Sequence, residues 1–328
     1  MRKLLLVGAA LALLAFAIDR HQARLARATP AGLTALAAGN PPAAPGTFPE
    51  QWIHGADCEG DPQFQVHAYN QNLFILRQSK CETFEAPFLY LIFGEDVILL
   101  LDTGANPSSD LFGRVGNLIR RWRADTGNQT AQLLVAHTHG HFDHVQGDAQ
   151  MANFPGLVAP VGIDLTQNGF EAFWGFQDYP NDRPTIDLGG RVLDVIGVPG
   201  HFGRSVALYD RQTQLLLTGD IVYPGHLFVF GPNSWPDFVA SIQRLVDFAS
   251  QNPVEAVVGC HVEYSTTPGV PYAYTTDFQP DELPVQFPPS ILAEVLAAAL
   301  EQNGDPECTI YPQFVIHPVY KCGITWNG

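Results

Sequence analysis

Short apolar runs of this 328-residue chain repeatedly end in a histidine or an aspartate. Such runs predict buried β-strands, and side chains that follow neighbouring strands at one edge of a layered α/β fold meet in space. The residues that follow five of these runs within three positions are Asp102, His139, His201, Asp220 and His261. We therefore expect an α/β fold with one shared site where these strands end.

The densest part of this pattern is the segment 136–147, A-H-T-H-G-H-F-D-H-V-Q-G. It contains the spacing H-x-H-x-D-H, and imidazole and carboxylate groups are the ligands of a borderline divalent metal such as zinc. Because a turn after a strand can direct neighbouring side chains apart, His139 and His141 could serve one ion, and Asp143 and His144 a second. A histidine-rich surface loop is the alternative, but four of the chain's 11 histidines fall within eight positions here.

The bulk composition excludes several classes of protein. Hydrophobic residues are 46% of the chain and charged residues 15%, which predicts a filled core. The formal net charge of −16 argues against a nucleic-acid-binding surface, which needs clustered positive charge, and against strong adhesion to anionic lipids. We expect a small-molecule substrate, while the oligomeric state stays open.

The N-terminus resembles a secretory signal. Arg2 and Lys3 precede an apolar run too short for a comfortable membrane span, and Ala15-Phe16-Ala17 fits the small-x-small pattern of a cleavage site. We predict a signal peptide over 1–17 and export to the periplasm or the medium, with no stable membrane insertion after cleavage. The alternative is an uncleaved N-terminal anchor that holds the protein outside the cytoplasm.

Composition divides the rest of the chain into three parts. Residues 18–48 are rich in Ala and Pro and predict a linker. Residues 49–268 hold the strands, the polar residues at their ends and two helices, and predict the catalytic domain. Residues 269–328 form a C-terminal extension with a helix near 290–302 and the Cys308–Cys322 segment.

Hydrophobic periodicity predicts the individual elements of the domain. Amphipathic patterns predict helices at 110–124 and 236–250. Strands are predicted within 64–78 and at 87–93, 97–101, 132–136, 156–161, 191–198, 205–209, 214–217 and 254–259. The aromatic-rich stretch 165–179 is read as a lid or pocket wall, with plain core as the alternative.

The five cysteines suit an exported protein, which can keep disulfides. We pair Cys58 with Cys81 and Cys308 with Cys322 because each pair is close in sequence, although four cysteines allow three connectivities. Cys260 ends an apolar strand, and we interpret it as a free, buried thiol.

Five stretches together resemble the metallo-β-lactamase-fold hydrolase superfamily. They are L-L-D-T-G at 100–104, T-H-G-H-F-D-H at 138–144, V-P-G-H at 198–201, L-T-G-D at 217–220 and V-V-G-C-H at 257–261. The resemblance covers about residues 49–268. It implies an αββα sandwich, in which two mixed β-sheets are flanked by helices, with a dinuclear metal site at one edge.

The resemblance also implies seven ligands for two zinc ions per chain. They are His139, His141 and His201 for the first ion, Asp143, His144 and His261 for the second, and Asp220 between the two. A hydroxide held between two such ions attacks an acyl carbon near neutral pH, so Asp143 and Asp220 count as catalytic. Asp102 and Thr138 are expected to orient ligands, and His137 to support the site.

The aspartate at the bridging position resembles the glyoxalase II and lactonase branches rather than true β-lactamases. The segment after Asp220, I-V-Y-P-G-H-L-F-V-F, lacks the glycine, cysteine and arginine pattern of glyoxalase II, which disfavours glutathione thioesters. Tyr223 is placed as in acyl-homoserine lactonases, where it assists at the substrate carbonyl, and packing under the site is its alternative. We interpret His226 as an exposed loop histidine, and a position in the substrate pocket is the alternative.

We therefore predict an exported, zinc-dependent binuclear hydrolase of the lactonase, esterase or thioesterase kind. It would use a metal-bridged hydroxide on an ester, lactone or amide bond of a small molecule. The alternatives are β-lactamase-like activity, an iron-dependent oxidation like that of persulfide dioxygenases, and a metal-binding module without turnover.

Overall fold

The computed structural model describes residues 45–162 and 166–325, which lie in one compact unit. The predicted signal peptide and most of the predicted linker lie outside these residues. Within the described ranges, none of the helices combines the length and the apolar character needed to span a bilayer. The backbone N–H of Thr47 donates to the carbonyl of Tyr69 (3.0 Å), and the rings of Phe48 and Tyr69 are in contact. The end of the predicted linker therefore already packs on the domain.

The first sheet has five strands in the order β1-β2-β3-β4-β5. Their bounds are β1 (Phe64–Asn70), β2 (Leu73–Gln78), β3 (Phe88–Phe93), β4 (Val97–Leu101) and β5 (Gln132–Ala136). β4 and β5 are parallel, and the other pairs are antiparallel. This sheet contains the predicted hairpin and the strand that leads into the histidine cluster.

The second sheet has six strands in the order β12-β11-β9-β8-β7-β6. Their bounds are β6 (Thr185–Asp187), β7 (Val192–Gly197), β8 (Val206–Asp210), β9 (Leu215–Gly219), β11 (Ala256–Gly259) and β12 (Gln286–Phe287). β9 and β11 are parallel, and the remaining neighbours are antiparallel. Both sheets are therefore mixed, as the resemblance implied.

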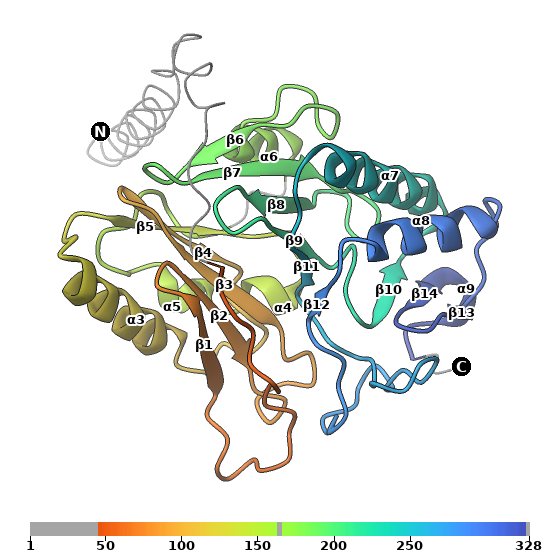
Figure 1. Ribbon diagram of the computed structural model, residues 1–328, viewed down its shortest axis with the longest axis horizontal. Helices are drawn as coiled ribbons and strands as arrows, with labels where there is room; N and C mark the ends of the chain where they lie inside the picture. The colour runs from red at the N-terminus through yellow and green to blue at the C-terminus, as the bar shows by residue number, and fades with distance from the viewer. Residues whose placement is uncertain (1–44, 163–165, 326–328) are drawn as a thin grey trace, which may run out of the picture. The chain divides into compact units, whose positions relative to one another are not determined.

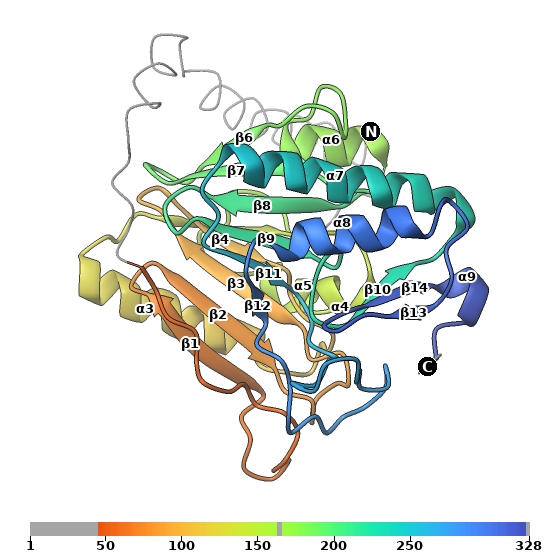
Figure 2. The ribbon, with the colours of Figure 1, turned by 45° about the vertical axis from the view of Figure 1, so that its right-hand side comes forward.

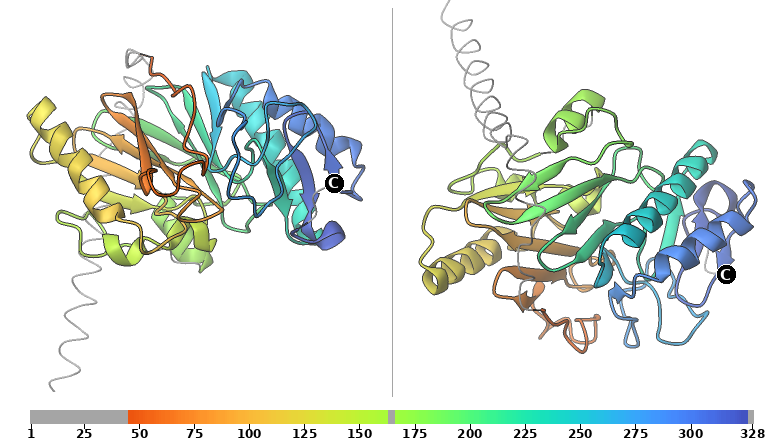
Figure 3. Two further views of the ribbon diagram at one scale, coloured as in Figure 1. Left: turned by 90° about the horizontal axis from the view of Figure 1, so that it is seen from below. Right: turned by 45° about the horizontal axis from the view of Figure 1, so that its top comes forward.

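The two sheets face each other across a shared core. Their strands are apolar on both faces, because one face packs on the other sheet and the opposite face packs under a helix. In β4, Leu99 and Leu101 belong to the cluster between the sheets, while Ile98 and Leu100 pack under a helix. Such two-sided burial is expected of a strand in the middle of a layered fold. Figure 3, left, shows the resulting layers of helix, sheet, sheet and helix edge on.

Helices cover the outer face of each sheet (Figure 1, Figure 2). α3 (Leu111–Thr126) packs on the first sheet; the Asp110 side chain accepts from the N–H of Gly113 and caps its start. α7 (Trp235–Gln251) and α8 (Ile291–Glu301) pack on the second sheet. Shorter helices are α4 (Phe142–Val145), α5 (Asp148–Met151), α6 (Gln167–Trp174), α9 (Val319–Cys322) and the 3₁₀ helix η1 (Pro232–Ser234).

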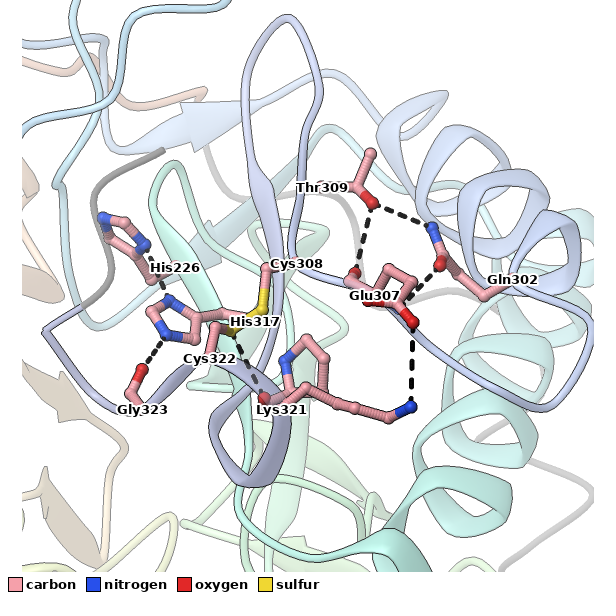
Figure 4. Close-up of a disulfide and its surroundings, with 10 residues drawn as sticks. His226, Gln302, Glu307, Cys308, Thr309, His317, Lys321, Cys322 and Gly323 are labelled. Atoms are coloured by element: carbon pink, nitrogen blue, oxygen red, sulfur yellow. Dashed lines mark hydrogen bonds and ion pairs between the residues drawn. A yellow bond between two sulfur atoms is a disulfide. The ribbon is translucent and has the colours of Figure 1, made fainter.

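A third, small sheet ties the C-terminal extension to the domain. It has the order β10-β14-β13, with β10 (His226–Val229), β14 (Val315–Pro318) and β13 (Thr309–Ile310). β10 and β14 pair in parallel, and β14 and β13 are antiparallel. The Cys308–Cys322 disulfide closes this segment beside the His226–His317 pair (Figure 4). This three-stranded sheet was not among the elements predicted from the sequence.

Other details confirm or correct the sequence-based expectations. The disulfides are Cys58–Cys81 and Cys308–Cys322, as predicted, and Cys260 is free and buried. The predicted strand at 156–161 is wrong, because this stretch forms only one bridge, from Leu157 to Leu133. In the aromatic stretch, Phe170 and Trp174 of α6 are buried between the sheets, which supports core rather than lid.

Candidate metal centre

The predicted metal-binding residues come from the ends of strands in both sheets. His139 follows β5 of the first sheet, whereas His201, Asp220 and His261 follow β7, β9 and β11 of the second. The short helix α4, which starts directly after His141, carries the remaining two ligand candidates. All seven residues meet in two adjacent groups, so the edge predicted from the strand ends exists in the fold.

The first group consists of His139, His141 and His201. Nδ1 of His141 lies 3.0 Å from Nε2 of His139 and 2.9 Å from Nε2 of His201. Their rings meet edge to face, with centroids 4.7 to 5.0 Å apart. Three imidazole nitrogens that converge in this way are a typical set of zinc ligands.

The second group consists of Asp143, His144, Asp220 and His261, all of them buried. Nε2 of His144 lies 3.3 Å from Oδ2 of Asp143, and Nε2 of His261 lies 3.2 Å from the same oxygen. The group thus combines two imidazoles with two carboxylates, which offset part of the charge of a divalent cation.

Asp220 stands between the two groups. Its Oδ2 atom faces four imidazoles, at 3.7 Å from Nε2 of His139, 3.5 Å from that of His201, 3.3 Å from that of His144 and 3.4 Å from that of His261. A carboxylate oxygen that is shared by both groups has the position of a bridging ligand.

The backbone orients two of the imidazoles. Nδ1 of His201 donates to the carbonyl of Phe228 (3.1 Å), and Nδ1 of His261 donates to the carbonyl of Glu85 (3.0 Å). Since a carbonyl only accepts, these contacts place a proton on Nδ1 and direct Nε2 toward the centre. Partners of this kind set the tautomer and the direction of metal-binding histidines.

Asp102 orients His144 in the same way. Its Oδ2 lies 2.9 Å from Nδ1 of His144, and the carboxylate also accepts from the backbone N–H (2.8 Å) and the hydroxyl (2.9 Å) of Thr138. Asp102 is fully buried and has a left-handed φ of 66°. Backbone strain of this kind is concentrated at functional sites. The expected supporting roles of Asp102 and Thr138 agree with this geometry.

The two groups differ in their electrostatics. Burial lowers the pKa of His139 well below its ordinary value, also lowers that of His141, and brings that of His201 to about 4. The first group therefore consists of neutral imidazoles, which is the protonation state that binds metals.

The second group is held by opposite charges. Burial disfavours the charged form of every member, but the attraction between the carboxylates and the imidazoles outweighs it. The pKa values of Asp143 and Asp220 lie well below the usual range, and those of His144 and His261 lie well above it. The carboxylates are therefore ionised, as cation ligands must be, and a metal that binds to this group would displace the extra protons of His144 and His261.

The polar atoms of the centre fit a bound cation. Among the described residues, Oδ1 of Asp220 is buried without a hydrogen-bond partner, and Nε2 of His261 faces the carboxylates of Asp143 and Asp220 without a well-aligned hydrogen bond. Buried polar atoms without partners are costly, and a metal ion would satisfy both. The full donor set of five imidazoles and two carboxylates suits zinc in both groups.

The other predicted site residues have different environments. Tyr223 is buried, its hydroxyl donates to the carbonyl of His226, and its ring centroid lies 5.6 Å from that of His261. This placement favours packing under the centre over contact with a substrate. The reading of His226 as an exposed loop histidine is wrong, because β10 buries it completely. His137 donates from Nδ1 to the carbonyl of His144 (3.0 Å), which fits its expected supporting role.

Two buried acids beside His261 were not anticipated from sequence. Burial raises the pKa of Glu85 to about 8 and that of Glu263 to about 7. Carboxylate oxygens of both lie near His261. Glu263 is two residues from a predicted ligand, but Glu85 belongs to a loop with no local signal.

Comparison with known proteins agrees with this architecture. The sequence profile of the Metallo-beta-lactamase superfamily matches residues 83–312, so this chain belongs to that superfamily. The family resemblance and the αββα fold predicted from the sequence are thereby confirmed.

Several relatives have named activities. The acyl-coenzyme A thioesterase MBLAC2 of Gallus gallus is 27% identical over an alignment of 217 residues, and the match covers 58% of this chain and 77% of that protein. A hydroxyacylglutathione hydrolase of Synechococcus sp. is 26% identical over 174 residues, 53% of this chain and 63% of that protein. Among solved structures, a metallo-beta-lactamase from Pontibacter korlensis aligns with a TM-score of 0.46 at 16% identity, over 73% of this chain and 100% of that one.

Proposed function

We propose that this protein is an exported binuclear zinc hydrolase that cleaves thioester or ester bonds of small molecules, lactones included. The observation that carries the proposal is the position of Asp220, whose Oδ2 lies between 3.3 and 3.7 Å from imidazoles of both groups. One shared carboxylate is the arrangement that two closely spaced ions need.

Each part of the centre has a role in this proposal. His139, His141 and His201 would bind one zinc ion, the Asp143 group the other, and Asp220 both. The ions would supply Lewis acidity and a water acidified to near neutral pH. The protein's own contribution is to hold neutral imidazoles in position through their Nδ1 contacts and to keep the ligand carboxylates ionised.

The overall reaction is a hydrolysis. Water gives its oxygen to the acyl carbon, the bond from that carbon to sulfur or oxygen breaks, and the leaving group takes up a proton. The named activities of the thioesterase and hydroxyacylglutathione hydrolase relatives support a thioester among the substrates. The complete second group speaks against an oxidation at a single iron.

Export is part of the proposal as well. The two disulfides suit an oxidising compartment. The apolar, positively preceded N-terminal run points to the periplasm or the medium.

The test measures metal content and turnover on the same sample. Protein purified without chelators should contain close to two zinc ions per chain and hydrolyse short acyl thioesters, aryl esters or lactones until a chelator is added. Asp220→Ala and His141→Ala should lower kcat/KM by at least about a thousandfold, because each removes a proposed ligand of the nucleophile's site. His54→Gln, outside the centre, serves as the control, and circular dichroism checks that every variant is folded.

Two outcomes would refute the proposal. One is wild-type turnover by either folded ligand variant. The other is one iron per chain with oxidative activity and no hydrolysis, which would assign the centre to iron chemistry.

A further inference from the structure

Aromatic side chains form a wall beside the metal centre. The wall consists of Phe202, Phe230, Phe228, Tyr274 and Phe84, which come from four separate segments of the chain because Phe228 and Phe230 lie at the end of β10. Phe230 exposes 40% of its surface, Phe202 is half-buried, and Phe228 is buried behind them.

The wall begins at the first ligand group. The ring of Phe202 lies 4.8 Å from that of His141 and 5.7 Å from that of His139. The ring of Phe230 lies 5.2 Å from His141 and 5.4 Å from His201. Both phenylalanines thus touch imidazoles that we assign to the first zinc ion.

From there the wall continues toward the second group. Phe228 stacks on Phe230 with centroids 6.0 Å apart, Tyr274 meets Phe228 at 5.1 Å, and Phe84 meets Tyr274 at 5.3 Å. The Tyr274 hydroxyl donates to Glu85, whose backbone carbonyl holds His261. The C-terminal extension therefore contributes a residue to the surroundings of the centre.

Exposed aromatic surface beside the metal centre indicates that an apolar part of the substrate packs there. Exposed hydrophobic surface beside a polar centre marks binding sites, and water on the exposed face of Phe230 is unfavourable. A substrate whose acyl carbon reaches the metal centre must place the substituent of that carbon within a few ångströms of the ligands. The wall lies at that distance, so an apolar acyl chain is the occupant that the geometry favours.

We infer that the aromatic wall binds the apolar acyl group of the substrate, and that the enzyme prefers medium-length acyl groups to acetyl. This inference rests on the proposed hydrolase function and adds the substrate class to it. Each methylene that leaves water on binding improves affinity by up to roughly fourfold, so a partly covered chain of several carbons gives a measurable preference.

The test compares acetyl, hexanoyl and octanoyl thioesters of N-acetylcysteamine. In the wild type, kcat/KM should rise at least tenfold from acetyl to octanoyl. Because both side chains also touch ligand imidazoles, the readout is the ratio of the octanoyl to the acetyl value, which Phe230→Ala and Phe202→Ala should each lower about fivefold or more. Phe230→Leu, which keeps an apolar side chain, should recover most of the preference.

Phe112→Ala is the matched control. Phe112 is also 40% exposed, but it lies on α3, and its ring contacts Phe154 instead of the centre. This variant should keep the wild-type chain-length profile. A flat profile in the wild type, or an unchanged profile in both wall variants, would overturn the inference.

A binding measurement separates this inference from the proposed function. Titration calorimetry of the zinc-loaded protein should show octanoate binding at least tenfold more tightly than acetate, and Phe230→Ala should remove most of that difference. If the protein hydrolyses none of the thioesters but keeps this difference, the hydrolase proposal fails and the acyl surface stands. If it hydrolyses them without any chain-length effect in either measurement, the acyl surface fails and the hydrolase stands.

Discussion

Asp220 shows how much one residue depends on its immediate backbone. Gly219 before it has φ +56°, and an added Cβ would lie 3.1 Å from Thr138. Glycine takes this left-handed conformation without strain, so β9 can turn and direct the carboxylate between the two ligand groups. The glycine at position 219 thus helps to place the carboxylate oxygen that faces both ligand groups.

The position of Tyr223 in the sequence predicted contact with the substrate, whereas in the structure its side chain is buried beneath the centre. We predict that Tyr223→Phe changes kcat/KM on lactones and thioesters less than about twofold, because the hydroxyl already donates to the carbonyl of His226. The buried carbonyl loses its donor, so the free energy of unfolding should fall by about 1–3 kcal/mol. Steady-state kinetics and urea denaturation check both parts. A tenfold loss of rate at unchanged stability would restore the catalytic role.

At the scale of elements, the small sheet connects the C-terminal extension to β10, the strand that leads away from the metal centre. β10 supplies the Phe228 carbonyl that orients His201, and β14 pairs along its whole length. His226 and His317 face each other across this pair, with their Nδ1 atoms 3.0 Å apart (Figure 4). Nε2 of His226 contacts the carbonyl of Tyr272 (2.9 Å), so polar contacts as well as strand pairing hold the extension to β10.

This arrangement predicts a pH dependence of stability. Burial lowers the pKa of His317 to about 4, below its ordinary value of 6.5, and lowers the pKa of His226 as well. Below pH 6.5 the unfolded chain binds the proton more readily than the folded one, so stability is fully present above 6.5 and falls from 6.5 toward 4. Urea denaturation at steps of half a pH unit should show this fall, and His317→Gln should make it shallower.

The quantity to compare is the slope of the free energy of unfolding against pH, because His317→Gln also changes the stability itself. His54→Gln serves as the control for the loss of a histidine elsewhere in the chain. Equal slopes for wild type and His317→Gln between pH 6.5 and 4 would contradict the assignment.

At the scale of the whole domain, the metal centre joins the two sheets. His139, His141, Asp143 and His144 follow the first sheet, and His201, Asp220 and His261 follow the second. Ions bound by both sets would therefore link the halves of the sandwich in addition to their apolar core.

Removal of metal should consequently destabilise the protein. A ligand present at about a hundred times its Kd stabilises the folded state by about 2.7 kcal/mol, which corresponds to several degrees in Tm for a domain of this size. Differential scanning calorimetry with and without a chelator should show this decrease, and zinc should reverse it. Asp220→Ala should show a clearly smaller shift. An identical Tm in all conditions would argue against a metal that bridges the sheets.

Local patterns in the sequence sufficed for the strands around the centre, for α3 and α7, and for the seven residues that converge. Alternating or continuous apolar runs report burial within a few residues, and the ligand types follow directly in the chain. The disulfide partners were close enough in sequence, 23 and 14 residues apart, for proximity to suggest them.

Contacts between distant segments had no such local signal. His261 and Glu85 are 176 residues apart, and His226 and His317 are 91 apart. The aromatic wall likewise assembles from four segments, each of which has the sequence of an ordinary loop or strand. These features arise because two sheets pack face to face and bring together residues that no short-range periodicity relates. The chain alone therefore indicated the candidate ligands, whereas only the tertiary structure decided what surrounds them.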